Sequence, residues 1–166
     1  MLVIYDLDKT SLYCPIADFM DRFIPEDVEK KKLYYRLYNI VYAVEMFFGL
    51  LKINKQMYHR AKNFSMMPNV HQIVVTARHY SLFTRLHAQK VFKDVFNDME
   101  LVCIAQGITG LSKAEVVSQI YPTFNNILMY DDSRKELGKM KRMYKKSFTG
   151  KQVRFLNDKR EVISDY

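Results

Sequence analysis

The sequence is poor in cysteine, and its cysteines and histidines follow no familiar metal-binding or redox spacing. Only Cys14 and Cys103 occur among the 166 residues, which is too few for a disulfide framework. There is no CxxC, HExxH or similar pair, so a structural zinc site is not expected. These absences predict an intracellular, cytoplasmic protein that needs neither disulfides nor zinc to fold.

Long apolar runs are missing as well. No run approaches the roughly 20 residues that span a bilayer. The first residues lack a signal-peptide pattern, because a charge arrives at Asp6 and no small-residue cleavage site follows. We therefore expect no membrane partner. Hydrophobic residues make up 49% of the chain and charged residues 27%, which predicts one globular domain with a real core.

Positive charge is concentrated in one stretch. The net charge is +8, and residues 134–154 hold nine lysines or arginines against one acid, Glu136. Apolar residues recur there at helical spacing: Leu137, Met140, Tyr144 and Phe148. The stretch is interpreted either as the solvated face of an amphipathic helix or as a surface that attracts nucleic acid. Both interpretations stay open.

Short apolar segments alternate with amphipathic ones along most of the chain. The expected strands are residues 2–5, 71–76, 101–105, 127–130 and 152–156. The expected helices between them are residues 80–92, 112–120 and 133–146, and Ser112 with Glu115 has the spacing of a capping box. Strands that alternate with helices predict parallel pairing in a three-layer, Rossmann-like α/β sheet.

Residues 13–68 interrupt this alternation and show no convincing strand. Shorter helices are expected near residues 16–23 and 54–63. Between them, one long helix is predicted by the apolar residues Leu33, Leu37, Ile40, Val41, Val44, Phe47, Phe48 and Leu51. That set is too wide for a single stripe, so the helix is expected to pack on more than one side. We predict an inserted helical subdomain, with the α/β core formed by residues 1–12 and 69–166.

Acidic residues stand at the ends of two predicted strands. Asp6 and Asp8 follow the first strand, and Asp131 and Asp132 follow the fourth. Ligands of open α/β sheets bind outside the carboxyl ends of the strands, so these acids are expected to converge. Four carboxylates need a neutralising partner, and Mg²⁺ is a hard cation that takes carboxylates and leaves room for phosphate oxygens.

Two further residues are expected at the same edge. Thr76 ends the second strand in "VVTAR", and Lys113 begins the helix before the fourth strand in "GLSKAEV". A hydroxyl and a cation suit the remaining oxygens of a phosphoryl group. The pattern therefore predicts a Mg²⁺-dependent site for phosphoryl transfer.

"DLDKT", "VVTAR", the Lys113 region and "DDS" together resemble the four ordered motifs of the haloacid dehalogenase superfamily of phosphatases. The resemblance covers residues 1–12 and 69–166. It implies a five-stranded sheet in the order 5-4-1-2-3, and the insertion resembles the superfamily's helical, type-one (C1) cap. A helical cap after "DLDKT" is loosely similar to the phosphoserine-phosphatase-like branch.

The resemblance also implies a role for each residue. Asp6 would be the nucleophile that forms an aspartyl-phosphate, and Asp8 the general acid and base. The metal would be held by the Asp6 carboxylate, the Asp8 backbone carbonyl and Asp132, with Asp131 beside them. The phosphate-binding pair would be Thr76 and Lys113. In support, Thr10 would hold the loop, and Arg78 would contact either the substrate or a surface acid.

Other residues are given ordinary roles. Glu136 is expected on a solvated helix face, or else as the distant acid of a longer fourth motif. Cys14 is expected to be a loop residue, because position 20 lacks the arginine of a cysteine-dependent phosphatase. The four histidines share no spacing. A final group is expected to pack between helices, with base stacking as the alternative: Tyr34, Tyr35, Tyr38 and Tyr42.

The predicted function is the hydrolysis of a small phosphomonoester, such as a nucleotide or another phosphorylated metabolite, by a monomer or homodimer. One alternative is a phosphatase acting on nucleic-acid 3′ or 5′ ends. Another is a nucleic-acid-binding module with a vestigial site. A phosphotransferase or mutase that uses the same intermediate also stays open.

Overall fold

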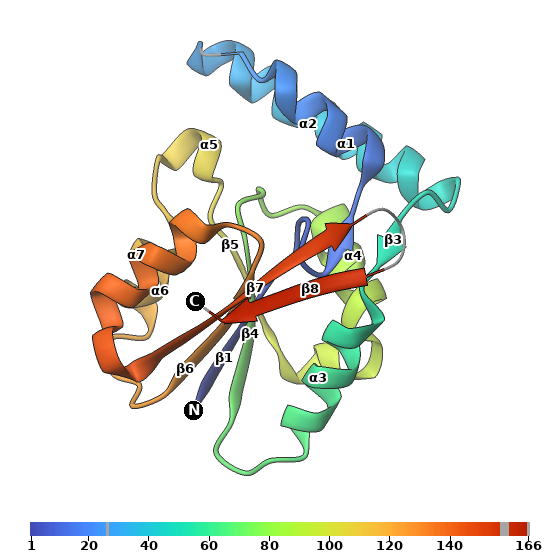
Figure 1. The fold of residues 1–166 in the computed structure, drawn as a ribbon. Helices are drawn as coiled ribbons and strands as arrows, with labels where there is room; N and C mark the ends of the chain where they lie inside the picture. Colours follow the sequence, from blue (N-terminus) through green and yellow to red (C-terminus); the bar gives the residue numbers. More distant parts are fainter. Residues whose placement is uncertain (26, 157–159, 166) are drawn as a thin grey trace.

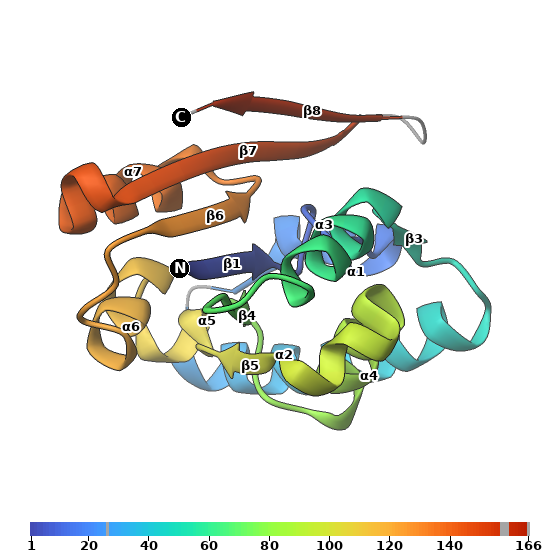
Figure 2. The same ribbon diagram turned by 90° about the horizontal axis from the view of Figure 1, so that it is seen from below.

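The computed structural model describes residues 1–25, 27–156 and 160–165. An α/β fold with five parallel strands is confirmed (Figure 1). The parallel strands are β1 (Leu2–Asp6), β4 (His71–Thr76), β5 (Glu100–Cys103), β6 (Ile127–Asp131) and β7 (Phe148–Leu156). They stand side by side in the order β7-β6-β1-β4-β5, which Figure 2 shows from one edge of the sheet to the other.

A sixth strand, β8 (Arg160–Asp165), pairs antiparallel with β7 and extends the sheet beyond the expected five strands. This strand was not predicted, because "REVISD" is short and mixes charged with apolar residues, which is typical of an edge strand. Strand β7 also begins four residues before the predicted 152–156. Its first residue, Phe148, is buried against the core.

Helices cover both faces of the sheet. They are α3 (Lys55–Ser65), α4 (Leu82–Phe92), α6 (Lys113–Ile120) and α7 (Arg134–Tyr144). Short 3-10 helices follow α4 and α7: η2 (Lys93–Asp98) and η3 (Lys145–Ser147). In β1, Val3 and Tyr5 belong to the core cluster under α3 and α4, whereas Leu2 and Ile4 belong to the cluster under α6 and α7. This alternation produces three layers, because successive strand residues point to opposite faces.

The remaining elements lie beyond the carboxyl ends of the strands. They are α1 (Pro15–Met20), η1 (Asp21–Phe23), α2 (Val28–Phe47), α5 (Gln106–Thr109), and the strands β2 (Leu12–Tyr13) and β3 (Lys52–Ile53). Figure 1 shows α1 and α2 across this end of the sheet. Strands β2 and β3 form a small antiparallel pair, so the expectation that residues 13–68 hold no strand is wrong.

Helix α3 falls inside the predicted insertion, yet it packs on the sheet. It contacts β4, α4 and η2, and Met57 and Ala61 are fully buried in the main core. Helix α3 therefore forms part of the layer that also contains α4. Among the described helices of the predicted insertion, those that stand over the end of the sheet are α1, η1 and α2.

Truncating the α3 anchor tests this placement. Because Met57 is 0% exposed, Met57→Ala should lower the free energy of unfolding by about 2–5 kcal/mol. The matched change Met66→Ala removes a side chain that is 71% exposed, and it should cost less than about 0.5 kcal/mol. Denaturant unfolding measures both variants. Equal effects would contradict the packing of α3 on the sheet.

The first part of the basic stretch forms the amphipathic helix α7, whereas the rest forms η3 and β7, so Phe148 lies on a strand and not on the predicted helical face. Leu137 and Met140 are buried under α7, and several basic residues of this stretch are exposed: Arg134, Lys135, Lys141, Arg142, Lys145 and Lys146. The side chain of Arg154, the last basic residue of the predicted 134–154 face, lies outside the described residues. None of the described helices combines the length and apolar character needed to cross a membrane.

Candidate functional site

A tight loop after β1 turns the chain back on itself and positions two acids. Asp6 ends β1 and is 2% exposed. The backbone N–H groups of Ser11 and Leu12 both donate to the Leu7 carbonyl, at 3.1 and 2.7 Å. Lys9 has a positive φ of 59°, which permits the reversal. Asp6 and Asp8 therefore stand at the carboxyl edge of the sheet, as the sequence predicted.

Lys113 is the cation between the two acidic pairs. Its Nζ lies 2.7 Å from Asp6 Oδ1 and 2.7 Å from Asp131 Oδ2, and all three side chains are nearly inaccessible to solvent. Burial alone would lower the pKa of Lys113, but Asp131 and Asp6 outweigh it and raise that pKa. Lys113 is therefore a fixed positive charge that reduces the repulsion between the acids.

The helix that carries Lys113 begins as predicted. Ser112 caps α6, and its side chain and that of Glu115 form the expected capping box. This places Lys113 at the first helical position, where its backbone N–H needs a partner outside the helix. Glu136 Oε2 accepts that N–H at 3.0 Å. The acidic site and the start of α6 are thus linked through α7.

Glu136 corrects a sequence-based expectation. It is 6% exposed rather than solvated, and it lines a 280 Å³ cavity together with Asp6, Lys113 and Asp132. Its position explains this: Ser133 caps α7 and accepts the backbone N–H of Glu136 at 3.3 Å. Glu136 lies three positions after Ser133, which is the spacing of a capping box, and this spacing is the signal that could have indicated an inward-facing acid.

Three carboxylates are close enough to share one ion. Oxygens of Asp6, Asp131 and Asp132 lie within 4.8 Å of one another. The Asp131 oxygens also accept from Lys113 and from the Ser133 backbone N–H. The Asp132 carboxylate has no hydrogen bond or ion pair with any described residue. This donor set fits a hard divalent cation, which prefers carboxylate oxygens.

The crowding of these acids changes their pKa values. Burial raises the pKa of Asp6 well above its usual value; Lys113 opposes this rise, and Asp131 and Asp132 reinforce it. Burial and the neighbouring Asp131 raise the pKa of Asp132 to about 6. Both shifts have burial as their main cause, and the neighbouring carboxylates add to it, because each disfavours the ionised form.

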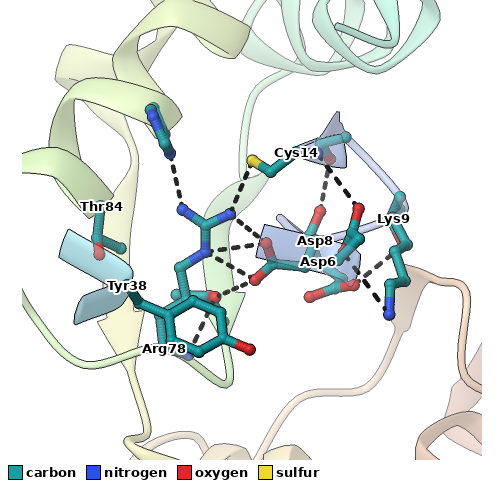
Figure 3. A network of polar contacts seen from close by, with 12 residues as sticks. Asp6, Asp8, Lys9, Cys14, Tyr38, Arg78 and Thr84 are labelled. Carbon is teal, nitrogen blue, oxygen red and sulfur yellow. Dashed lines mark hydrogen bonds and ion pairs between the residues drawn. The ribbon is translucent and has the colours of Figure 1, made fainter. Parts of the chain in front are cut away.

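Asp8 belongs to a second network (Figure 3). Arg78 Nε donates to both Asp8 oxygens at 2.9 Å, and its terminal nitrogen also contacts Asp8. The predicted phosphate ligand Thr76 donates its hydroxyl to Asp8 at 3.1 Å. Burial would raise the pKa of Asp8, but Arg78 outweighs burial and lowers it. Asp8 is therefore ionised and held by Arg78.

Arg78 connects Asp8 to several elements. It is 8% exposed, contacts His87 Nδ1 of α4 at 2.7 Å and donates to Cys14 Sγ at 3.3 Å. Its guanidinium carbon lies 3.9 Å from the ring centroid of Tyr42 on α2. Arg78 was expected to contact either the substrate or a surface acid. In the structure it contacts an acid, but that acid is Asp8, the candidate catalytic residue.

Two other expectations concern residues near this network. Thr10 donates to Asp6 Oδ2 at 3.0 Å, which agrees with its predicted supporting place in the loop. Cys14 stands at the start of α1, and burial raises the pKa of its thiol to about 12. A buried thiol with that pKa is a poor nucleophile. Its burial therefore argues against Cys14 as a nucleophile.

The buried His87 predicts a pH effect on stability. Burial and the adjacent Arg78 lower its pKa from 6.5 to about 4. Between those values the unfolded chain binds a proton that the folded chain does not, so the free energy of unfolding falls as pH drops from 6.5 towards 4. His87→Gln, which keeps an acceptor for Arg78, should flatten this fall. The exposed His59→Gln serves as control in denaturant unfolding at several pH values, and an unchanged slope for His87→Gln would contradict the assignment.

Together, the described residues form an α/β protein with an acidic, lysine-bridged site at the carboxyl edge of its parallel sheet. Comparison with protein-family models, curated proteins and solved structures finds no match for this chain. The site is therefore defined by its own geometry.

Proposed function

We propose that the protein is a Mg²⁺-dependent phosphohydrolase that cleaves small phosphomonoesters through an aspartyl-phosphate on Asp6. The observation that carries this proposal is the meeting of Asp6, Asp131, Asp132 and Lys113 at one edge of the sheet. The resemblance of "DLDKT" and "DDS" to haloacid dehalogenase phosphatases supports the same chemistry. Mg²⁺ would be held by Asp6, Asp132 and the Asp8 carbonyl, with Asp131 beside them, and would supply charge stabilisation to the phosphoryl oxygens.

In the first step an Asp6 carboxylate oxygen attacks phosphorus while the bond to the ester oxygen breaks. Asp8 donates a proton to the departing oxygen. In the second step water attacks phosphorus, Asp8 accepts a proton from it, and the bond between phosphorus and Asp6 breaks to release inorganic phosphate. Lys113 favours the ionised form of Asp6 that attacks, because its ammonium lies 2.7 Å from that carboxylate and opposes the rise in pKa that burial causes.

The pairing of Asp8 with Arg78 implies a rearrangement before proton donation. An ionised Asp8 with a lowered pKa is a poor acid. A dianionic phosphate group competes with Asp8 for the guanidinium of Arg78 and for the hydroxyl of Thr76. When these donors turn to the phosphate, Asp8 loses its stabilising partners and its pKa rises. The substrate itself therefore prepares the acid.

A panel of phosphate esters tests the proposal. Glycerol 3-phosphate, ribose 5-phosphate, phosphoserine and nucleoside monophosphates should release inorganic phosphate in the presence of Mg²⁺ and lose this activity with a chelator. Beryllium fluoride, which mimics a phosphoryl group bound to an aspartate, should bind the protein only when both Mg²⁺ and the wild-type Asp6 are present. A chain that folds but turns over none of these esters would contradict the proposal.

Phosphorylated nucleic-acid ends are a second candidate substrate. Lys135, near the start of the basic helix α7, lines the same 280 Å³ cavity as Asp6 and Asp132. A polyanion that follows α7 would therefore reach the acids. Turnover of 3′- or 5′-phosphorylated oligonucleotides with a steep salt dependence would favour this candidate. Binding of oligonucleotides that survives Asp6→Asn without any turnover would favour a binding module instead.

A further inference from the structure

A larger cavity adjoins the acidic site. It has a volume of about 450 Å³ and lies between α1, α2 and the loops after β4 and β5. Asp8, Ala77 and Gln106 line both this cavity and the 280 Å³ cavity that holds Asp6. A phosphoryl group over Asp6 would thus extend its leaving group past Asp8 into the larger space.

The larger cavity is lined by aromatic rings. Tyr35, Tyr38 and Tyr42 reach it from one face of α2, and His79 reaches it from the loop after β4. The Tyr35 and His79 rings lie 5.1 Å apart between centroids. Such a lining favours a planar ring, because aromatic faces stack on one another.

Polar atoms of the cavity lining indicate which groups the edge of such a ring would carry. His79 Nε2 is buried and has no hydrogen-bond partner among the described residues, which is costly unless a ligand supplies one. Asp21 lines the same space and accepts from Tyr38 at 2.5 Å. Asp18 adds a second carboxylate. Lys9 pairs with Asp18 and Asp21 at 3.6 and 3.2 Å, but each carboxylate keeps further acceptor sites. Together with His79 Nε2 in its acceptor tautomer, these carboxylates suit a ring that carries N–H groups.

We infer that the leaving group is a planar nitrogen heterocycle bearing N–H donors, carried on a short linker, as in a nucleoside monophosphate. This inference rests on the proposed function. It goes further because it assigns the α2 tyrosines and His79 to recognition of the base. A cavity of about 450 Å³ is within the usual size range of small-molecule sites.

Ribose 5-phosphate is the matched comparison, because it retains the sugar and phosphate but lacks the base. In the presence of Mg²⁺, kcat/KM for AMP, CMP or GMP should exceed that for ribose 5-phosphate by about tenfold or more, as expected for one stacked base. Tyr35→Leu should reduce this ratio about tenfold. Tyr80→Leu, at a side chain that is 67% exposed and outside the cavity lining, is the control.

The outcomes separate the two proposals. If ribose 5-phosphate and glycerol 3-phosphate are cleaved as well as any nucleotide, the heterocycle inference fails and the phosphohydrolase stands. If the Tyr35→Leu ratio equals that of wild type, base recognition by α2 is wrong. If no ester is cleaved, the proposed phosphohydrolase function is wrong, and the heterocycle inference, which rests on it, is wrong as well.

The outer face of α2 carries an independent feature. Leu33, Leu37, Ile40, Val44 and Phe47, here called the α2 stripe, recur at alternating steps of four and three residues. That is the spacing of a coiled-coil seam. The stripe is exposed throughout; Ile40 is 62% and Phe47 86% exposed. The helix contacts α1, α4 and α5, but most of the apolar residues that predicted packing on more than one side are exposed within the described part of the chain.

The distribution of charged residues along α2 indicates which partner would fit the α2 stripe. Exposed basic residues are confined to the N-terminal half of α2 and include Lys30, Lys32 and Arg36, whereas the exposed residues beyond Arg36 are apolar. An antiparallel second copy would place these cations beside the partner helix's C-terminal carbonyls, which carry partial negative charge. A parallel copy would bring like charges together. The geometry points to an antiparallel homodimer through the α2 stripe.

Single cysteines distinguish the arrangements. Ile40 is the midpoint of the stripe, so in an antiparallel pair it lies beside the same residue of the second copy. Leu33 lies instead beside the C-terminal end of the stripe of the second copy. In a Cys103→Ser background, which leaves only the buried Cys14, Ile40→Cys should form a disulfide-linked dimer on mild oxidation and Leu33→Cys should not. Cross-linking through Leu33→Cys would overturn the antiparallel arrangement.

Sedimentation tests the dimer itself. The wild-type chain should sediment as a dimer at micromolar concentration, and Ile40→Glu as a folded monomer. Ile120→Glu, on α6 at a side chain that is 46% exposed, should remain dimeric. A monomeric wild type would overturn the inference. If that monomer also co-sedimented with anionic lipid vesicles, the stripe would be a membrane-binding face instead.

Discussion

Replacing Asp6 by asparagine should lower kcat by at least about 1,000-fold, because the amide cannot form the aspartyl-phosphate. The change is nearly isosteric, and the amide side chain would retain an oxygen within reach of Lys113 Nζ, which lies 2.7 Å from Asp6 Oδ1. The fold should therefore survive. Initial rates of phosphate release with saturating Mg²⁺ measure the effect on the best ester of the panel.

The control for this variant is Asp94→Asn. Asp94 lies in η2, accepts from Tyr58 on the exposed surface and is not part of the acidic cluster. Its replacement should leave kcat within about twofold of wild type, as expected for a surface change. Near wild-type activity in Asp6→Asn would remove Asp6 from the chemistry, and the site would then need another nucleophile.

The largest expected effect on stability comes from Lys113→Met. Methionine fills a similar volume but leaves Asp6 and Asp131, which are 2% and 0% exposed, without their shared cation. Removing one partner of a buried ion pair typically costs about 3–5 kcal/mol, because an uncompensated charge stays buried. Denaturant unfolding at neutral pH without divalent ions should show a loss of this size.

A second change separates charge from packing. Adding Asp131→Asn to Lys113→Met removes one uncompensated carboxylate, so the double variant should recover part of the lost stability. Mg²⁺ should also stabilise the Lys113→Met single variant, since an ion that binds only the folded chain raises its free energy of unfolding. If neither treatment restores stability, the loss reflects packing rather than electrostatics.

The meeting of the acids could be predicted because it depends on topology. Parallel strands end at one edge, so Asp6 and Asp131 had to approach each other once β1 and β6 were recognised. Lys113 was predictable for the same reason, since its helix precedes β6. Such features follow from the order of the elements and need no knowledge of side-chain conformation.

Other parts of the site depend on details that a sequence does not display. The pairing of Arg78 with Asp8 depends on rotamers and on the packing of Tyr42 from a distant helix. Glu136 was misjudged because helical periodicity cannot tell a solvated acid from one turned inwards beside a cap. The pair β2 and β3 has two residues per strand, which is too short for any pattern to register.

The guanidinium of Arg78 has a consequence for how the molecule responds to change. It touches side chains that come from the loop after β1, from the start of α1, from α2 and from α4. The contacted residues range from Asp8 to His87 in the chain, yet one planar group contacts all four segments. A substitution that loosens the packing of α2 should therefore change the position of Asp8, because both contact Arg78. The helices over the site and the candidate catalytic residues are thus expected to respond as one cooperative unit.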